Sequence, residues 1–65
     1  MSIDTVNGLQ LKARRVERGL RAADVAEKFA PPVSKQRVSA IEQLHRVRPV
    51  LVERYIRAVD AATDG

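Results

Sequence analysis

Apolar residues recur along the chain at spacings of three and four positions, and glycine or proline interrupts them at intervals. Such spacing is typical of amphipathic α-helices, and no stretch shows the alternation of apolar and polar residues that indicates strands. The breaks fall at Gly8, Gly19, Pro31-Pro32 and Pro49. The pattern therefore predicts an all-α protein, with helices over about 9–18, 22–29, 34–44 and from 49 onward.

The first predicted helix has one apolar stripe of helical period, which we expect to face the core: Val6, Leu9, Ala13, Val16 and Leu20. Leu11 falls off this stripe, so the same period places it outward. Gly19 follows the last turn and is expected in the left-handed conformation that commonly ends a helix.

The second and fourth predicted helices each have a clear inward side. In the second it consists of Ala22, Val25, Ala26 and Phe29. Pro31-Pro32 ends this helix, since proline lacks the N–H group and disfavours α geometry in the residue before it. The fourth helix begins near Pro49, a good residue for a first turn. Its inward side consists of Leu51 or Val52, Tyr55, Ala58, Val59 and Ala62.

The third predicted helix differs because its leading turn is polar. Ser34 stands at the N-cap position, where its hydroxyl can accept a hydrogen bond from the N–H of Gln36 or Arg37. The expected inward residues are Val38, Ile41 and Leu44, which leaves Lys35, Gln36, Ser39 and Ala40 outward or on the flank.

Composition limits what the domain can be. The chain has 65 residues, and a domain of about that size buries only ~60% of the surface that its unfolded chain exposes. It has no cysteine and one histidine, His45, so neither a disulfide nor a structural zinc site is expected. We expect no metal, no cofactor and no small-molecule ligand. Self-association remains a common aid to stability, so a homodimer is expected.

Positive charge is concentrated in two blocks. Lysine and arginine outnumber aspartate and glutamate 12 to 8, a net charge of +4. Residues 9–21 hold five basic residues against Glu17 alone, and residues 34–48 hold four against Glu42 alone. This balance favours a polyanionic partner.

Other classes of protein find little support. The chain lacks a cysteine nucleophile, a Ser/His/Asp set with a free histidine and a glycine-rich phosphate loop, so we do not expect an enzyme. No apolar run approaches the ~18 residues of a membrane span, and the N-terminus lacks the pattern of a signal peptide. A cytoplasmic protein, of a prokaryote or of a phage-infected host, is expected.

The order and spacing of several segments resemble the lambda-repressor and Cro type of helix-turn-helix regulators. The matching segments are LKARRVERGL (11–20), VAEK (25–28), VS (33–34), RVSAIE (37–42) and RP (48–49). The resemblance covers about residues 9–58. It implies a compact four- to five-helix bundle in which residues 1–65 form one DNA-binding domain, with the helix-turn-helix at about 22–44.

The resemblance also implies roles for individual residues. Ala26 corresponds to the small residue where two helices touch, and Arg15 and Glu42 to an internal ion pair. The residues expected to contact base edges are Lys35, Gln36, Ser39 and Ala40, whose polar side chains suit that task. Those expected to contact phosphates are Arg21, Ser34, Arg37, His45, Arg46 and Arg48. The candidate dimer contacts are Val47, Val50 and Leu51.

Three features depart from the family pattern. The turn 29–32 contains two prolines, lacks the usual glycine and is about two residues longer. Arg21-Ala22 stands where the family often has a capping Thr or Asn followed by a glutamine that binds phosphate. Leu11 faces inward by the resemblance but outward by its helical period.

Together these features predict a sequence-specific regulator of transcription, a Cro-like repressor that binds a two-fold operator as a dimer through the major groove. Two other classes stay open. One is an antitoxin-type helix-turn-helix protein that binds a toxin and autoregulates its operon. The other is a helical bundle whose basic face binds an acidic protein.

Overall fold

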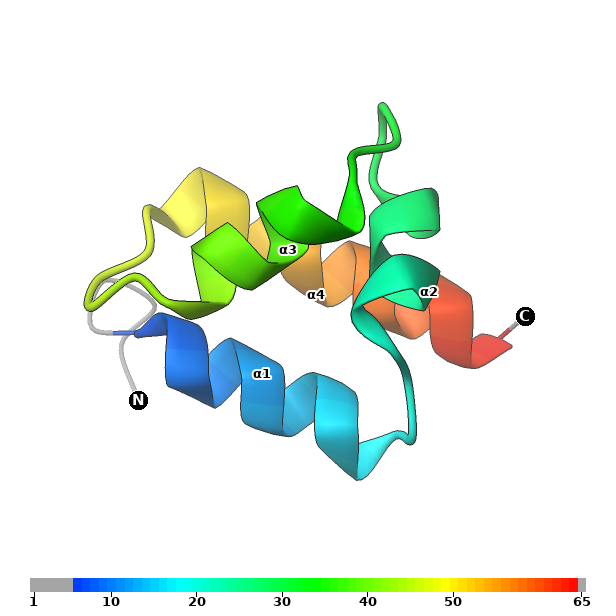
Figure 1. Cartoon of the computed structure of the whole chain (residues 1–65), viewed down its shortest axis with the longest axis horizontal. Helices are drawn as coiled ribbons and strands as arrows, with labels where there is room; N and C mark the ends of the chain where they lie inside the picture. The colour runs from blue at the N-terminus through cyan, green and yellow to red at the C-terminus, as the bar shows by residue number, and fades with distance from the viewer. Residues whose placement is uncertain (1–5, 65) are drawn as a thin grey trace.

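The computed structural model describes residues 6–64, and this part of the chain contains four helices and no strand. They are α1 (Gly8–Glu17), α2 (Ala22–Lys28), α3 (Lys35–Glu42) and α4 (Pro49–Asp64). In Figure 1, α4 lies behind α1 and α3, and α2 lies beside the C-terminal end of α4. The all-α prediction is confirmed, with four helices where four or five were expected.

Local hydrogen bonds explain where α1 and α3 begin. Asn7 Oδ1 accepts from the Gln10 backbone N–H at 2.9 Å, and Gln10 Oε1 accepts from the Asn7 N–H at 2.8 Å. This reciprocal capping box starts α1 one residue earlier than predicted. Ser34 Oγ accepts from the Arg37 N–H at 3.2 Å, so Ser34 caps α3 as expected.

The turns after α1 and α2 have different constructions. Gly19 has φ +67°, the left-handed conformation expected of it. After α2, Phe29 takes an extended conformation and the Val33 N–H donates to the Ala26 carbonyl at 3.1 Å. This bond ties the proline-containing turn back to α2, and Figure 1 shows the turn projecting from the bundle.

The core lies among α2, α3 and α4, with a single buried leucine from α1. Its buried apolar residues are Leu11, Val25, Ala26, Phe29, Val38, Ile41, Val47, Val52, Tyr55, Ala58 and Val59. The Tyr55 ring meets the edge of Phe29 at a centroid distance of 6.3 Å, a favourable T-shaped contact between α4 and the end of α2. The inward sides predicted for the second and fourth helices are therefore largely correct, although Ala22, Leu51 and Ala62 are only partly buried.

The rotation predicted for α1 from its apolar period is wrong. Leu9 is 69% exposed and Val16 is exposed as well, whereas Leu11 is only 3% exposed. The side that packs inward carries Gly8, Leu11 and Arg15. A Cβ atom on Gly8 would clash with backbone atoms of Ile41 and Glu42, so the absence of a side chain permits the contact of α1 with α3.

The inward orientation predicted for Leu44, near the end of α3, is also wrong. Leu44 is exposed, because α3 ends at Glu42 and the chain has already turned. Its carbonyl instead accepts from the Gly8 N–H at 2.8 Å, which fastens the start of α1 to this turn. Across the described helices, none combines the length and apolar character that crossing a bilayer requires.

Candidate nucleic-acid interface

Helix α3 has one buried side and one exposed side. Val38, Ile41 and Glu42 are buried against the core. The outward side carries Lys35, Gln36, Ser39 and Ala40, all exposed. The four residues expected to contact bases thus share one accessible surface of one helix.

On the buried side, three donors surround the carboxylate of Glu42, which is only 5% exposed. Arg15 Nε donates to Glu42 Oε2 at 2.8 Å, and Arg15 Nη2 donates to Oε1 at 3.2 Å. The Tyr55 hydroxyl also donates to Oε2. The pair that the resemblance implied is therefore present, and Tyr55 joins it from α4.

The contacts with Glu42 also favour the protonated forms of Arg15 and Tyr55. Hydrogen bonds to Glu42 raise the pKa of Arg15 above its usual value. Burial raises the pKa of Tyr55, and the hydrogen bond to Glu42 raises it further. Arg15 also donates through Nη1 to the Leu20 carbonyl at 2.9 Å. One charged side chain therefore joins α1, α3 and the turn that leads to α2.

On the exposed side, a shallow hollow follows α3. It is lined by Ala22, Lys35, Gln36, Ser39, Ala40 and Gln43. Gln43 was not among the expected contacts, although it stands four residues after Ser39 and seven after Gln36, the spacing of one helical face. The hollow offers amide, hydroxyl and ammonium groups beside the methyl group of Ala40.

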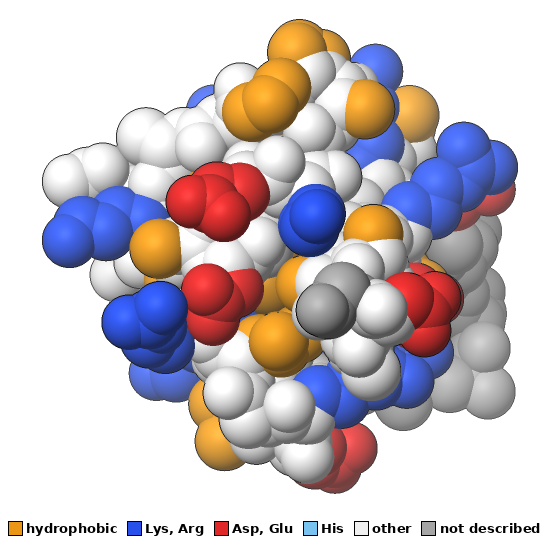
Figure 2. Space-filling view, turned by 90° about the vertical axis from the view of Figure 1, so that its right-hand side faces the viewer, with side chains coloured by type: hydrophobic (Ala, Val, Ile, Leu, Met, Phe, Trp, Pro, Cys, Tyr) orange, Lys and Arg blue, Asp and Glu red, His pale blue; other side chains and the backbone are white. Residues whose placement is uncertain are grey.

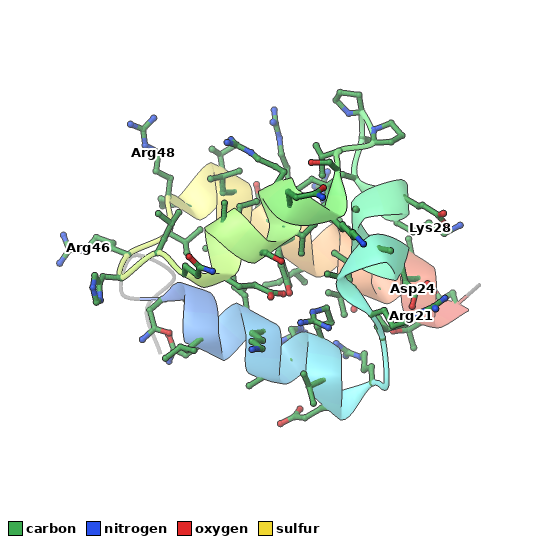
Figure 3. The ribbon with its side chains drawn as sticks, viewed as in Figure 1. Arg21, Asp24, Lys28, Arg46 and Arg48 are labelled. Carbon is green, nitrogen blue, oxygen red and sulfur yellow. The ribbon has the colours of Figure 1, made fainter. Side chains whose placement is uncertain are left out.

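The four cations of residues 34–48 stand in a segment with a single acidic residue. The only carboxylate of that segment belongs to Glu42, which points inward. Within residues 6–64, Lys35, Arg37, Arg46 and Arg48 form no ion pair. Figure 3 shows Arg46 and Arg48 at the end of the molecule where α3 terminates.

The opposite end of the molecule is electrostatically mixed. The Arg21 backbone N–H donates to Asp24 Oδ2 at 2.8 Å, and this hydrogen bond lowers the pKa of Asp24. The Arg21 guanidinium lies 3.5 Å from the same carboxylate (Figure 3). Figure 2 views this end and shows acidic side chains beside basic ones. Arg21 thus has an ion-pair partner, which Arg37, Arg46 and Arg48 lack within residues 6–64.

Val47 cannot be a dimer contact in this fold. It is 0% exposed, and its N–H donates to the Val6 carbonyl at 3.0 Å. Arg46 and Arg48 on either side are exposed, so the turn directs the valine inward between them. Val50, which is 53% exposed, and the partly buried Leu51 remain available.

The chain matches no protein-family model, no curated protein and no solved structure. The chemistry of the surface must therefore indicate its partner. An exposed helix with directed donors and acceptors, next to unneutralised cations, can bind a polyanion that also presents hydrogen-bonding edges.

Proposed function

We propose that the protein is a sequence-specific DNA-binding regulator of transcription, in which α2, the proline-containing turn and α3 act as a helix-turn-helix. The main support is the outward side of α3. It exposes Lys35, Gln36 and Ser39, while the only carboxylate nearby in sequence is buried. A Cro-like repressor that binds a two-fold operator is the form of regulator that we favour.

The outward side suits the chemistry of base edges. The major groove is about 12 Å wide, accepts an α-helix and displays a distinct pattern of donors and acceptors for each base pair. The Gln36 amide can pair with adenine through two hydrogen bonds, and the Lys35 ammonium can reach guanine N7 and O6. Ala40 can contact a thymine methyl group.

The turn after α3 suits the phosphate backbone. His45, Arg46 and Arg48 are all exposed, and neither arginine has an ion-pair partner in the described part of the chain. Such cations release condensed counterions when they meet phosphates, which gives affinity without sequence preference. At the other end of α3, Ser34 and Arg37 are exposed beside the helix N-terminus, which favours an anion.

A dimer would place two copies of α3 in successive major grooves, about 34 Å apart. Val50 and Leu51 at the start of α4 are the contacts that we propose for it. A large apolar side chain as exposed as Val50 is a reasonable element of such an interface.

Selection of bound duplexes from random DNA tests the proposal, followed by affinity measurements on the selected site. We expect Gln36→Ala to cost about 1–3 kcal/mol on that site and to relax the preference at one base pair. Arg46→Ala should weaken the binding of all duplexes alike and lower the salt slope by about 1. The absence of any sequence preference at moderate salt would contradict the proposed function. The same pattern for both variants would show that α3 is not the recognition helix.

A further inference from the structure

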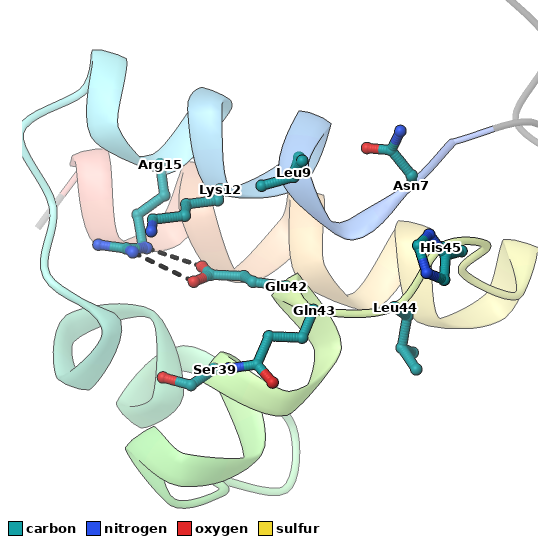
Figure 4. Close-up of a pocket in the computed structure, with 9 residues that line it drawn as sticks. All are labelled: Asn7, Leu9, Lys12, Arg15, Ser39, Glu42, Gln43, Leu44 and His45. Carbon is teal, nitrogen blue, oxygen red and sulfur yellow. Dashed lines mark hydrogen bonds and ion pairs between the residues drawn. The ribbon is translucent and has the colours of Figure 1, made fainter.

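A second hollow lies between α1 and α3, next to the one along the outward side of α3. Leu9 and Lys12 of α1 border it together with Asn7, the N-cap of that helix, and Ser39, Gln43 and His45 border it from α3 and the following turn. Figure 4 shows Lys12 extending from α1 alongside Arg15, with Ser39 on α3 and Gln43 just after the end of that helix. Because Ser39 and Gln43 line both hollows, the two form one continuous surface.

Among residues 6–64, one cation that lines this second hollow, Lys12, has no ion-pair partner. Arg15 and Glu42 neutralise each other through two hydrogen bonds. The ammonium group of Lys12 has no carboxylate partner within residues 6–64. Asn7 uses Oδ1 to cap α1, which leaves its Nδ2 group to donate to another acceptor. The hollow therefore combines a positive charge with amide donors, a set that suits a phosphate group.

Arg14 of α1 and Arg18, the C-cap of that helix, lie on different surfaces. Arg14 borders a groove between α1 and α4, together with Val52 and Ile56. Arg18 lies 3.8 Å from Asp60 of α4. Of the basic residues of α1, only Lys12 and the paired Arg15 border the hollow on the α3 side, so Lys12 is the cation of α1 that faces α3 without an ion-pair partner among residues 6–64.

We propose that Lys12 binds a backbone phosphate of DNA, so that the bound duplex extends from α3 across to α1. This inference rests on the proposed function, because the phosphate is that of a strand flanking the bases that α3 contacts. Through Lys12, α1 becomes part of the interface with DNA. A phosphate contact of this kind strengthens binding without selecting a base sequence.

A matched pair of variants tests this contact. Lys12→Gln and Arg14→Gln each remove one positive charge from exposed positions of the same helix, two residues apart. Affinity would be measured over a series of salt concentrations, for the selected operator and for a random duplex. Lys12→Gln is expected to weaken both duplexes by the same factor and to reduce the slope of log K against log salt by about 0.9. Arg14→Gln is expected to leave the slope unchanged.

The outcomes separate this contact from the proposed function. Equal slopes for the two variants, with the sequence preference of the unmodified protein intact, would overturn the Lys12 contact alone. A protein without sequence preference would overturn the proposed function, and one that binds no DNA would overturn both. A DNA-binding titration in which inorganic phosphate replaces chloride at equal ionic strength tests whether Lys12 binds a backbone phosphate or the free anion. If inorganic phosphate competes with DNA more strongly than chloride does, and Lys12→Gln removes this difference, Lys12 binds the free anion. That result would overturn the backbone contact.

Discussion

The two sides of α3 differ in whether their polar groups have hydrogen-bond partners within the described part of the chain. On the inward side, both oxygens of Glu42 accept hydrogen bonds, from Arg15 on α1 and Tyr55 on α4. On the outward side, the side chains of Lys35, Gln36 and Ser39 have no partner within residues 6–64. A buried polar group without a partner is costly, whereas an exposed one exchanges partners with water at little cost. The inward side therefore holds the helix in place, and the outward side remains available for a ligand.

The comparison predicts that substitutions on the two sides will differ in what they change. Those on the inward side should lower the free energy of unfolding, and through it the fraction of protein able to bind. Those on the outward side should leave the free energy of unfolding unchanged and lower only the affinity for DNA, the ligand that we propose. Stability and DNA affinity therefore have to be measured on each variant.

The largest expected loss of stability follows from Glu42→Ala. Removing one partner of a buried ion pair typically costs about 3 to 5 kcal/mol, because the other charge stays buried without compensation. Here the Arg15 guanidinium would lose its carboxylate partner and keep only the Leu20 carbonyl, and the Tyr55 hydroxyl would lose its acceptor. Urea denaturation followed by circular dichroism measures the change. The exposed carboxylate of Glu53 provides the control, and Glu53→Ala should stay within about 0.5 kcal/mol of the unmodified protein. A similar small change for Glu42→Ala would contradict a stabilising role for the cluster.

Tyr55→Phe should cost about 1.5 to 3 kcal/mol, the usual value of a hydrogen bond to a charged group. It also makes a prediction about pH. The folded state raises the pKa of Tyr55 above the ordinary value of about 10, so it holds the phenol proton more tightly than the unfolded chain does. This stabilisation is complete below about pH 10 and is lost as the pH rises further. The free energy of unfolding should therefore fall more steeply above pH 10 in the unmodified protein than in Tyr55→Phe. Parallel alkaline curves would mean that the hydroxyl contributes nothing to that dependence.

Gly8→Ala tests the contact that sets the rotation of α1. Alanine favours helices over glycine, so propensity alone predicts a gain of about 0.5–1 kcal/mol. The added methyl group would instead meet the backbone of Ile41 and Glu42, and such overpacking typically costs about 1–3 kcal/mol. Leu9→Ala is the control. Leu9 directly follows Gly8 but is exposed, so the loss of its larger side chain should change stability little. A thermal melt that ranks the two variants in the reverse order would show that α1 is rotated differently.

The sequence predicted the ends of the helices better than their orientation. Gly19, Ser34 and Pro49 act within a few residues of themselves, so their effect on the backbone can be read locally. The rotation of α1 depends on a contact between Gly8 and α3, more than thirty residues away in sequence. The predicted apolar stripe has a clear period, but its three residues within α1, Leu9, Ala13 and Val16, are exposed. Periodicity identifies the apolar sides of a helix, but it cannot choose between two of them.

In the candidate site, too, the features set by one helix could be predicted from the sequence, and those set by packing between elements could not. The outward positions of α3 followed from the period of one short helix, and the structure has Lys35, Gln36, Ser39 and Ala40 together on the exposed side. The part that Tyr55 plays at Glu42 could not be predicted, because it requires the relative placement of α3 and α4. Val47 was misassigned for a similar reason. An apolar residue in a basic turn resembles an exposed contact until its burial is known.

The smallest expected effect on stability follows from Gln36→Ala, and it sharpens the comparison most. Gln36 is exposed and forms no hydrogen bond with another described residue, so its replacement should change the free energy of unfolding by less than about 0.5 kcal/mol. Any loss of DNA affinity in this variant must then arise at the interface. Paired urea and DNA-binding titrations of Gln36→Ala and Tyr55→Phe measure both quantities. If Gln36→Ala were as destabilising as Tyr55→Phe, the outward side would contribute to folding, and the contrast between the two sides of α3 would be wrong.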